Sequence, residues 1–221
     1  MKVLIFGATG MVGQGVLREC LLDPSVEVVL SIGRSATGQQ HPKLHEVVRQ
    51  SLTDLAPLED QLRGYDACFF CLGVSSAGRT EEDYRRVTYE LTVSVGQTLA
   101  QLDPGMTFIY VSGAGTDSTE HGRTMWARVK GQTENALLRM PFRAAYMFRP
   151  GVIRPLHGIR SKTRGYRLLY TVLAPFVLLA SAVAPNSITT TEKMGRAMIH
   201  AVQKGAPKAL LGTRDINALA K

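Results

Sequence analysis

The chain has 221 residues, a formal net charge of +8 and 45% hydrophobic residues. This length allows one domain with a large core, which we expect to span residues 1–221, and is too short for two full-sized domains. The composition excludes a disordered chain. The positive charge favours an anionic partner such as a phosphorylated small molecule or a membrane surface, with a generally basic surface as the simpler alternative. Because the chain has no long Lys/Arg run and no basic stripe interleaved with aromatics, we expect no nucleic acid as a partner.

Strands alternate with helices along most of the chain. Short apolar runs predict buried strands, and apolar residues three or four positions apart predict helices. The expected strands cover residues 3–6, 27–32, 44–49, 67–72, 107–111, 144–148 and 209–211. The expected helices cover residues 11–22, 81–102, 124–140 and 192–204. Since parallel neighbours are usually joined by a helical crossover, this alternation predicts an α/β fold with a doubly wound parallel sheet and helices on both faces.

The three cysteines are too few for a disulfide framework. Cys68 and Cys71 are spaced as C-x-x-C, but residues three apart on a strand point to opposite faces. We therefore expect Cys20, Cys68 and Cys71 to be structural, with no metal site. This cysteine usage suits a reducing compartment. Because no signal peptide is visible either, we expect the cytoplasm.

The sharpest motif is Gly7-Ala8-Thr9-Gly10-Met11-Val12-Gly13, which starts where the first expected strand stops and opens the first expected helix. The first glycine allows a tight turn, the second lets the backbone approach a pyrophosphate, and the third lets the helix pack closely on the sheet. The amides of the first helical turn then face the anion. A glycine-rich turn without a ligand is the alternative, but the strand–turn–helix context favours a Rossmann-type dinucleotide site. The expected cofactor-binding residues here are Gly7, Thr9, Gly10, Met11, Val12 and Gly13.

The residues after the second expected strand indicate which dinucleotide binds. NAD sites usually place Asp or Glu there for the ribose hydroxyls. This chain has Gly33, Arg34 and Ser35 instead. Since Arg34, beside Ser35, is suited to the 2′-phosphate of NADP, we expect NADP, with NAD less favoured. The alternative is that Arg34 is an ordinary exposed loop arginine.

Together these motifs resemble the short-chain dehydrogenase/reductase superfamily, and within it the atypical, epimerase-like branch that includes the Tat-interacting oxidoreductase family. The resemblance spans roughly the whole chain. Besides the glycine motif, it rests on five segments: Gly33-Arg34, Cys71-Leu72-Gly73, Val111-Ser112, Val129-Lys130-Gly131 and Phe148-Arg149-Pro150-Gly151-Val152.

The resemblance implies roles for several of these residues. Ser112 would hydrogen-bond a substrate carbonyl, and Lys130 would hold the nicotinamide ribose hydroxyls. Asp54, after the third expected strand, would touch the adenine. Two further segments would lie beside the cofactor, the second of them on the nicotinamide side: Cys71, Leu72 and Gly73, and Pro150, Gly151 and Val152.

The family's catalytic acid is a tyrosine four residues before the lysine, and Trp126 occupies that position. Trp126 and Lys130 share a helix face, but an indole N–H cannot act as a general acid near neutral pH. Trp126 is therefore expected to cap the nicotinamide or fill the substrate pocket. His121 has a suitable intrinsic pKa for a substitute acid, although an exposed loop histidine is the favoured interpretation. Asp117 and Tyr84 are further candidates.

An apolar stretch at residues 168–184 is shorter than a typical membrane-spanning helix and contains Pro175. The resemblance implies that residues 153–190 form a small helical cap on the substrate side, and in some members the contact of a homodimer. Peripheral membrane contact through residues 160–184 stays open, because basic residues precede the apolar stretch. These are Arg160, Lys162, Arg164 and Arg167.

Three functions follow from these observations. The first is an NADP-dependent oxidoreductase or epimerase-like enzyme acting on a small carbonyl or alcohol substrate. The second, favoured by Trp126, is a non-catalytic NADP-binding regulator or sensor. The third is a membrane-peripheral reductase for an apolar acceptor.

Overall fold

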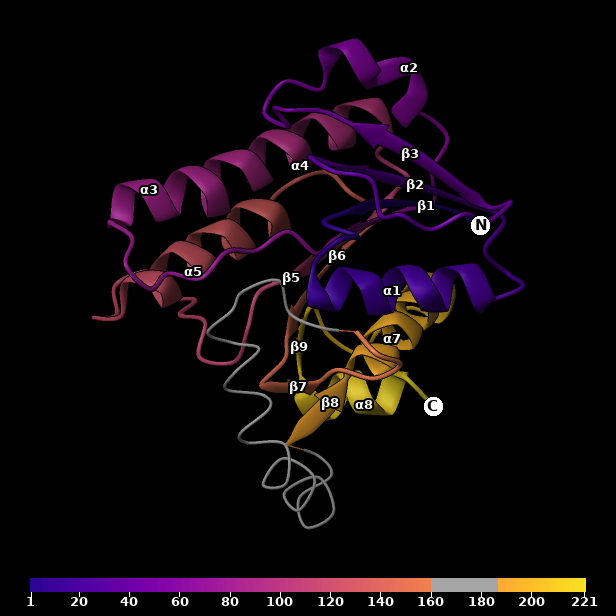
Figure 1. Cartoon of the computed structure of the whole chain (residues 1–221). Helices are drawn as coiled ribbons and strands as arrows, with labels where there is room; N and C mark the ends of the chain where they lie inside the picture. Colours follow the sequence, from indigo (N-terminus) through magenta and orange to yellow (C-terminus); the bar gives the residue numbers. More distant parts are fainter. Residues whose placement is uncertain (160–186) are drawn as a thin grey trace.

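The computed structural model describes residues 1–159 and 187–221. Within them, a seven-stranded parallel sheet forms the centre of the molecule, in the order β3-β2-β1-β4-β5-β6-β9 (Figure 1). Its first six strands follow the Rossmann order, so the expected fold class is confirmed. The strands are β1 (Lys2–Phe6), β2 (Val28–Gly33), β3 (Leu44–Val48), β4 (Ala67–Phe70), β5 (Thr107–Val111), β6 (Ala144–Arg149) and β9 (Leu210–Gly212).

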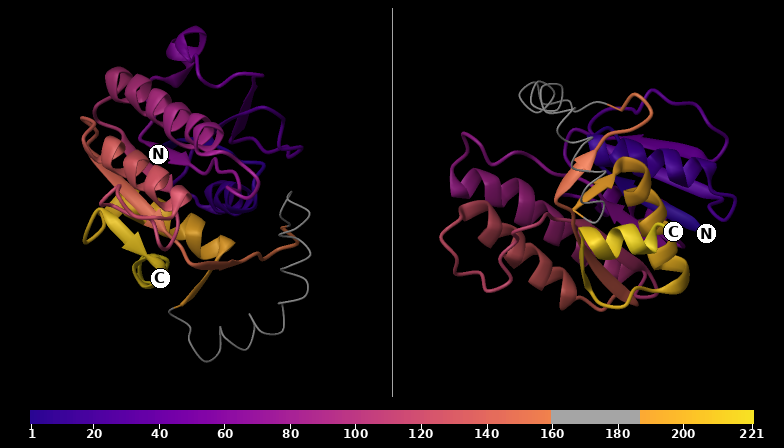
Figure 2. Two further views of the ribbon diagram at one scale, coloured as in Figure 1. Left: turned by 90° about the vertical axis from the view of Figure 1, so that its left-hand side faces the viewer. Right: turned by 90° about the horizontal axis from the view of Figure 1, so that it is seen from below.

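Helices cover both faces of this sheet (Figure 2). One face packs against α1 (Met11–Leu22), α7 (Thr191–Lys204) and α8 (Thr213–Leu219). The other packs against α2 (Glu59–Leu62), α4 (Leu91–Leu102) and α5 (Met125–Leu138). The alternation of strand side chains divides the core accordingly: in β1, Ile5 faces the first group and Phe6 the second.

The same alternation places the cysteines of the C-x-x-C segment. Cys68 is buried in the core beneath α4 and α5, whereas Cys71 packs against the core beneath α1 and α7. The two thiols therefore lie on opposite faces of the sheet, as expected from strand geometry. Both are free cysteines.

The expected helix at 81–102 is continuous, but its hydrogen-bonding pattern changes in the middle. It consists of α3 (Glu81–Arg85), a π-helical segment η2 (Arg86–Glu90), and α4. Three kinds of element were not expected: a 3-10 turn η1 (Ala56–Leu58) leading into α2, the C-terminal α8, and a separate parallel pair of strands. The pair is β7 (Val152–Arg154) and β8 (Ile188–Thr190). Three-residue strands are too short to produce a periodic pattern.

Only the ends of the expected cap at 153–190 are described, and they carry β7 and β8. The apolar stretch at 168–184 lies outside the described residues, as do Arg160, Lys162, Arg164 and Arg167. None of the helices in the described part of the chain has the length and apolar character that a membrane span requires.

Candidate cofactor and active site

A cavity of about 930 Å³ opens at the carboxyl ends of the central strands. It lies across β1 and β4, where the strand order reverses and where open parallel sheets bind ligands. Each strand around it contributes the residue that directly follows it. These are Gly7 after β1, Arg34 after β2, Cys71 after β4, Ser112 after β5 and Pro150 after β6.

Two glycines give the turn after β1 its shape. Gly7 has a φ of +83°, and a Cβ added there would stand 2.7 Å from the backbone nitrogen of Leu72. A Cβ added to Gly13 would stand 2.1 Å from the carbonyl oxygen of Gly7. Any larger residue at Gly13 would push α1 away from the turn. Gly13 therefore supports the cradle from behind and does not line the cavity.

Helix α1 points its amino end into the cavity. Gly10 is its N-cap, and among the described residues no side chain caps this end. The first amide to bond back into the helix is that of Gln14, which donates to Gly10 O at 2.8 Å. The amides of Met11, Val12 and Gly13 thus have no acceptor within the helix. Together with the positive end of the helix dipole, they fit the pyrophosphate of a dinucleotide.

The ends of β2 and β3 form the opposite part of the cavity. Arg34 is exposed and lines it beside Ser35. Within the described residues, the lining contains no Asp or Glu, and its cations are Arg34 and Lys130. This part therefore suits an anionic group better than a ribose diol that requires a carboxylate acceptor.

Asp54 does not line the cavity, in contrast to the expectation. Its Oδ1 accepts a hydrogen bond from the amide of Ala56 at 3.0 Å, at the start of the 3-10 turn. The segment after β3 contributes Gln50 and Leu52 to the lining instead.

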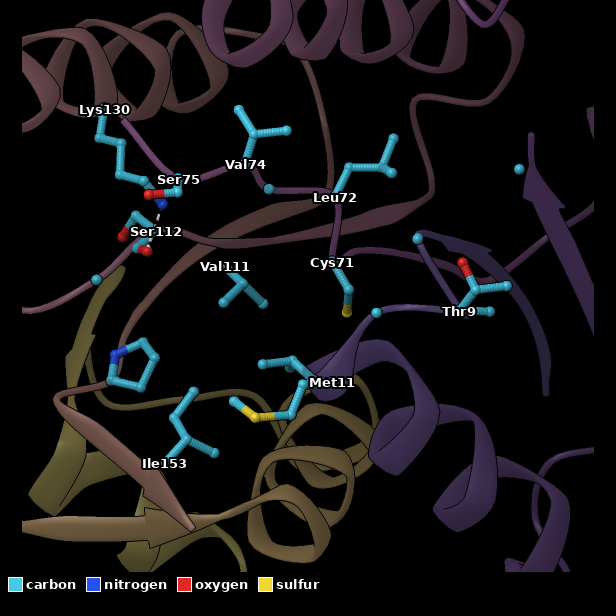
Figure 3. A pocket seen from close by; sticks show the side chains of 18 of the residues that line it. Thr9, Met11, Cys71, Leu72, Val74, Ser75, Val111, Ser112, Lys130 and Ile153 are labelled. Atoms are coloured by element: carbon cyan, nitrogen blue, oxygen red, sulfur yellow. Dashed lines mark hydrogen bonds between the residues drawn. The ribbon is translucent and has the colours of Figure 1, made fainter. Parts of the chain in front are cut away.

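Trp126 and Lys130 lie one turn apart on α5 and both line the cavity. Lys130 reaches toward the end of β5, where its Nζ donates to the carbonyl oxygen of Ser112 at 2.5 Å (Figure 3). Burial lowers the pKa of Lys130 to about 8, although the Glu134 carboxylate acts in the opposite direction. The ammonium group can therefore lose its proton close to neutral pH.

Behind Ser112 lies a buried ion pair that was not predicted from the sequence. Glu134 is 0% exposed, and Nε of Arg149 donates to its two carboxylate oxygens at 3.0 and 3.1 Å. Ser112 Oγ donates to Glu134 Oε1 at 2.5 Å. The spacing of Trp126, Lys130 and Glu134, each four residues apart on α5, was the signal that could have revealed the carboxylate.

None of the three candidate acids lines the cavity. His121 is exposed on the loop before α5. Asp117 holds this loop together: a hydrogen bond from the Thr119 hydroxyl and another from the Gly122 amide lower its pKa, so it is a poor proton donor. Tyr84 is only 2% exposed and lies in the protein interior.

Val152 also falls outside the lining. Its side chain is 43% exposed, and the next residue of β7, Ile153, lines the cavity (Figure 3). The alternation of side chains along a strand explains the exchange, since neighbouring residues face opposite sides.

The other predicted site residues are brought together. Those that line the cavity are Gly7, Thr9, Gly10, Met11, Val12, Arg34, Ser35, Cys71, Leu72, Gly73, Ser112, Trp126, Lys130, Pro150 and Gly151. Lining residues that were not predicted include Ser31, Gln50 and Leu52.

Comparisons with known proteins agree with this geometry. Residues 2–93 match the family model of the semialdehyde dehydrogenase NAD binding domain. The chain is 26% identical over 164 residues to protein FMP52-2, mitochondrial, of Scheffersomyces stipitis. This match covers 72% of this chain and 68% of that protein. It is 27% identical over 155 residues to protein HTATIP2 of Rattus norvegicus, covering 69% of this chain and 62% of that protein.

Among solved structures, the fold is similar to that of UDP-glucuronic acid 4-epimerase from Bacillus cereus in complex with NAD. The TM-score is 0.69 at 13% identity, over 96% of this chain and 78% of that one. The chain thus has the NAD-binding Rossmann fold, and its resemblance to the epimerase-like short-chain dehydrogenases/reductases, with HTATIP2 and FMP52-2 among its relatives, is confirmed.

Proposed function

We propose that the chain binds NADP(H) in this cavity and is an oxidoreductase or epimerase-like enzyme for a small carbonyl or alcohol substrate. The observation that carries the proposal is the cavity itself. The amino end of α1, which no described side chain caps, lines the cavity between Arg34 at one end and Lys130 at the other. The described lining contains no carboxylate. The complex of the similar Bacillus cereus epimerase with NAD supports a nicotinamide dinucleotide as the ligand.

Different residues of the cavity would bind different parts of the cofactor. The amides of Met11 and Val12 would hold the pyrophosphate, and Arg34 with Ser35 would hold the 2′-phosphate of the adenosine ribose. The nicotinamide would then lie at the end of the cavity that contains Trp126. The cofactor would supply the hydride for reduction, or accept it in oxidation.

Binding of NADPH and NADH to Arg34→Ala tests the choice of cofactor. A charge-assisted hydrogen bond contributes about 1.5–3 kcal/mol, and the exposure of Arg34 places its contribution at the lower end. Calorimetry should therefore show NADPH affinity about tenfold weaker in Arg34→Ala, with NADH affinity unchanged. Arg63→Ala is the matched control, because Arg63 is exposed and lies outside the lining.

Two results would contradict the proposal at different levels. Equal losses for NADPH and NADH, or no loss for either, would remove the argument for NADP. Binding of neither nucleotide by the unmodified chain would remove the proposed function altogether.

A non-catalytic NADP-binding sensor is the second candidate, and two observations favour it. Trp126 stands where the family has its acid, and the hydroxyl of Ser112 is directed at Glu134. A panel of carbonyl and quinone substrates with NADPH, run beside Trp126→Tyr, separates the two functions. Turnover by the unmodified chain supports the enzyme, whereas turnover only after the substitution supports the sensor.

For partners and location we propose a small-molecule substrate, a homodimer and the cytoplasm. Peripheral membrane contact through residues 160–184 is the alternative for an apolar acceptor. Light scattering tests the dimer, and co-sedimentation with anionic vesicles at low salt tests the membrane contact, which fails if the protein stays in the supernatant. A fluorescently tagged chain distinguishes the cytoplasm from the mitochondrial location that the name of FMP52-2 carries.

A further inference from the structure

The hydroxyl of Ser112 is unable to donate a hydrogen bond into the cavity. A hydroxyl has one hydrogen, and that of Ser112 is directed at Glu134 Oε1 at 2.5 Å, with Phe148 O at 3.2 Å as a second acceptor. Arg149 holds the Glu134 carboxylate in place from the other side. Towards the cavity Ser112 Oγ thus offers lone pairs only, whereas a substrate carbonyl oxygen requires a donor.

Lys130 supplies donors at the same place. An ammonium group carries three N–H bonds, and within the described residues Lys130 uses one of them, toward Ser112 O. Nζ also lies 5.8 Å from the centre of the Tyr110 ring. The remaining N–H bonds are free to meet a substrate oxygen in the cavity that Lys130 lines.

The other titratable side chains of the described lining are poorly suited to proton transfer. Arg34 lies at the far end of the cavity, after β2, and a guanidinium group does not give up its proton in proteins. Burial raises the pKa of Cys71 to about 12.

The groups packed around Lys130 leave its proton exchangeable. Glu134, on the same helix, favours the charged form, but Arg149 from β6 neutralises this carboxylate, and the desolvation of Nζ outweighs it. From β5, Tyr110 stays neutral because burial raises its pKa, and the buried Tyr84 of α3 interacts with Tyr110.

We propose that Lys130 is the catalytic residue that gives a proton to, or takes it from, the substrate oxygen, the role for which the resembling family uses tyrosine. This rests on the proposed function. In the reducing direction the substrate carbonyl carbon gains a hydride, which a reduced nicotinamide dinucleotide supplies, and the π pair of the carbonyl moves to oxygen. That oxygen takes a proton from Nζ, and the neutral amine regains a proton from water. In the overall reaction, one carbonyl group gains one hydride and one proton and becomes one alcohol.

A titration of Lys130 by NMR tests the proposal without any substrate. The lysines are labelled with ¹³C, and the Cε signal of Lys130 is identified as the one that disappears in a Lys130 variant. Two variants, Lys130→Arg and Lys130→Met, are used, so that the signal can still be assigned if one of them does not fold. Lys204→Arg, an exposed position outside the lining, is the control. The Lys130 signal should titrate with a midpoint near 8, well below the ordinary lysine value of about 10.4. A Lys130 midpoint above about 10 would overturn the proposal.

Kinetics and binding then separate this proposal from the proposed function. Lys130→Arg keeps the charge and keeps N–H donors for the nicotinamide ribose hydroxyls, but it cannot release a proton. NADPH affinity should therefore change less than about threefold, while carbonyl reduction falls by about 10²–10⁴-fold. Reduction that persists in Lys130→Arg would overturn the role of Lys130 and leave the proposed function standing. If the unmodified chain binds no nucleotide, both fail together.

Discussion

Replacing Glu134 with glutamine removes one charge from the interior and leaves the side-chain volume almost unchanged. In the folded protein this carboxylate is fully buried and accepts hydrogen bonds from Arg149 and Ser112. In Glu134→Gln the guanidinium group of Arg149 would lose its counter-charge and keep only an amide oxygen and its bond to Ser118 Oγ at 2.6 Å. Ser112 can still donate to the amide oxygen, so the loss falls mainly on Arg149.

The cost follows from the burial of the two partners. Breaking a buried ion pair by removing one partner destabilises a protein by about 3–5 kcal/mol. The side chain of Arg149 is 20% exposed, so water compensates in part and the cost should be near 3 kcal/mol. For a chain of this size each kcal/mol shifts Tm by about 2–4 °C, which gives a loss of about 6–12 °C.

Thermal unfolding followed by circular dichroism and calorimetry at pH 7 measures this loss. Glu82→Gln is the matched control, because Glu82 is 85% exposed in its pair with Arg86 and should shift Tm by less than about 2 °C. If Glu134→Gln melts within about 2 °C of the unmodified protein, the ion pair does not hold the site as described.

Three other outcomes follow from the same structure. Gly13→Val should weaken NADPH binding at least about a hundredfold in calorimetry, because its Cβ would meet Gly7 O at 2.1 Å and displace the amino end of α1. Trp126 is the sole tryptophan of the chain and lines the cavity, so NADPH should quench the protein's indole fluorescence, and Trp126→Phe should abolish this signal while calorimetry still detects binding. The folded pKa of Lys130 is lowered from 10.5 to about 8, so the unfolded chain binds more protons between these values and stability should rise with pH over this range. Denaturant unfolding should show that Lys130→Met lacks this rise.

Much of the architecture was predictable because its signals are local. Apolar runs followed by glycine or by a polar turn identified the strands of the main sheet, and the glycine motif identified the end of the sheet at which the cavity opens. Parallel strands bring their carboxyl ends to one edge, so Cys71, Ser112 and Pro150 meet there although they are far apart in sequence.

The details that escaped prediction depend on contacts between distant residues or on very short elements. Side-chain direction within β7 decides that Ile153 and not Val152 faces the cavity, and a three-residue strand carries no periodicity to reveal it. Asp54 was placed near the adenine by resemblance, but its carboxylate is used by the 3-10 turn that follows it.

The pairing of Glu134 with Arg149 joins α5 to the end of β6 and became visible only in three dimensions. It changes the expected chemistry of Ser112, whose hydroxyl was assigned to a substrate carbonyl and is directed at a carboxylate instead. Sequence motifs identify which residues meet at a site, whereas the direction of each hydrogen bond depends on the neighbours that packing supplies.

A crystal structure of the protein grown with saturating NADPH would show whether the amino end of α1 and Arg34 hold the nucleotide. We expect pyrophosphate oxygens within hydrogen-bonding distance of the amides of Met11 and Val12, and the adenosine 2′-phosphate against the guanidinium group of Arg34. Nucleotide bound elsewhere on the molecule, or a cavity that contains none under these conditions, would contradict it.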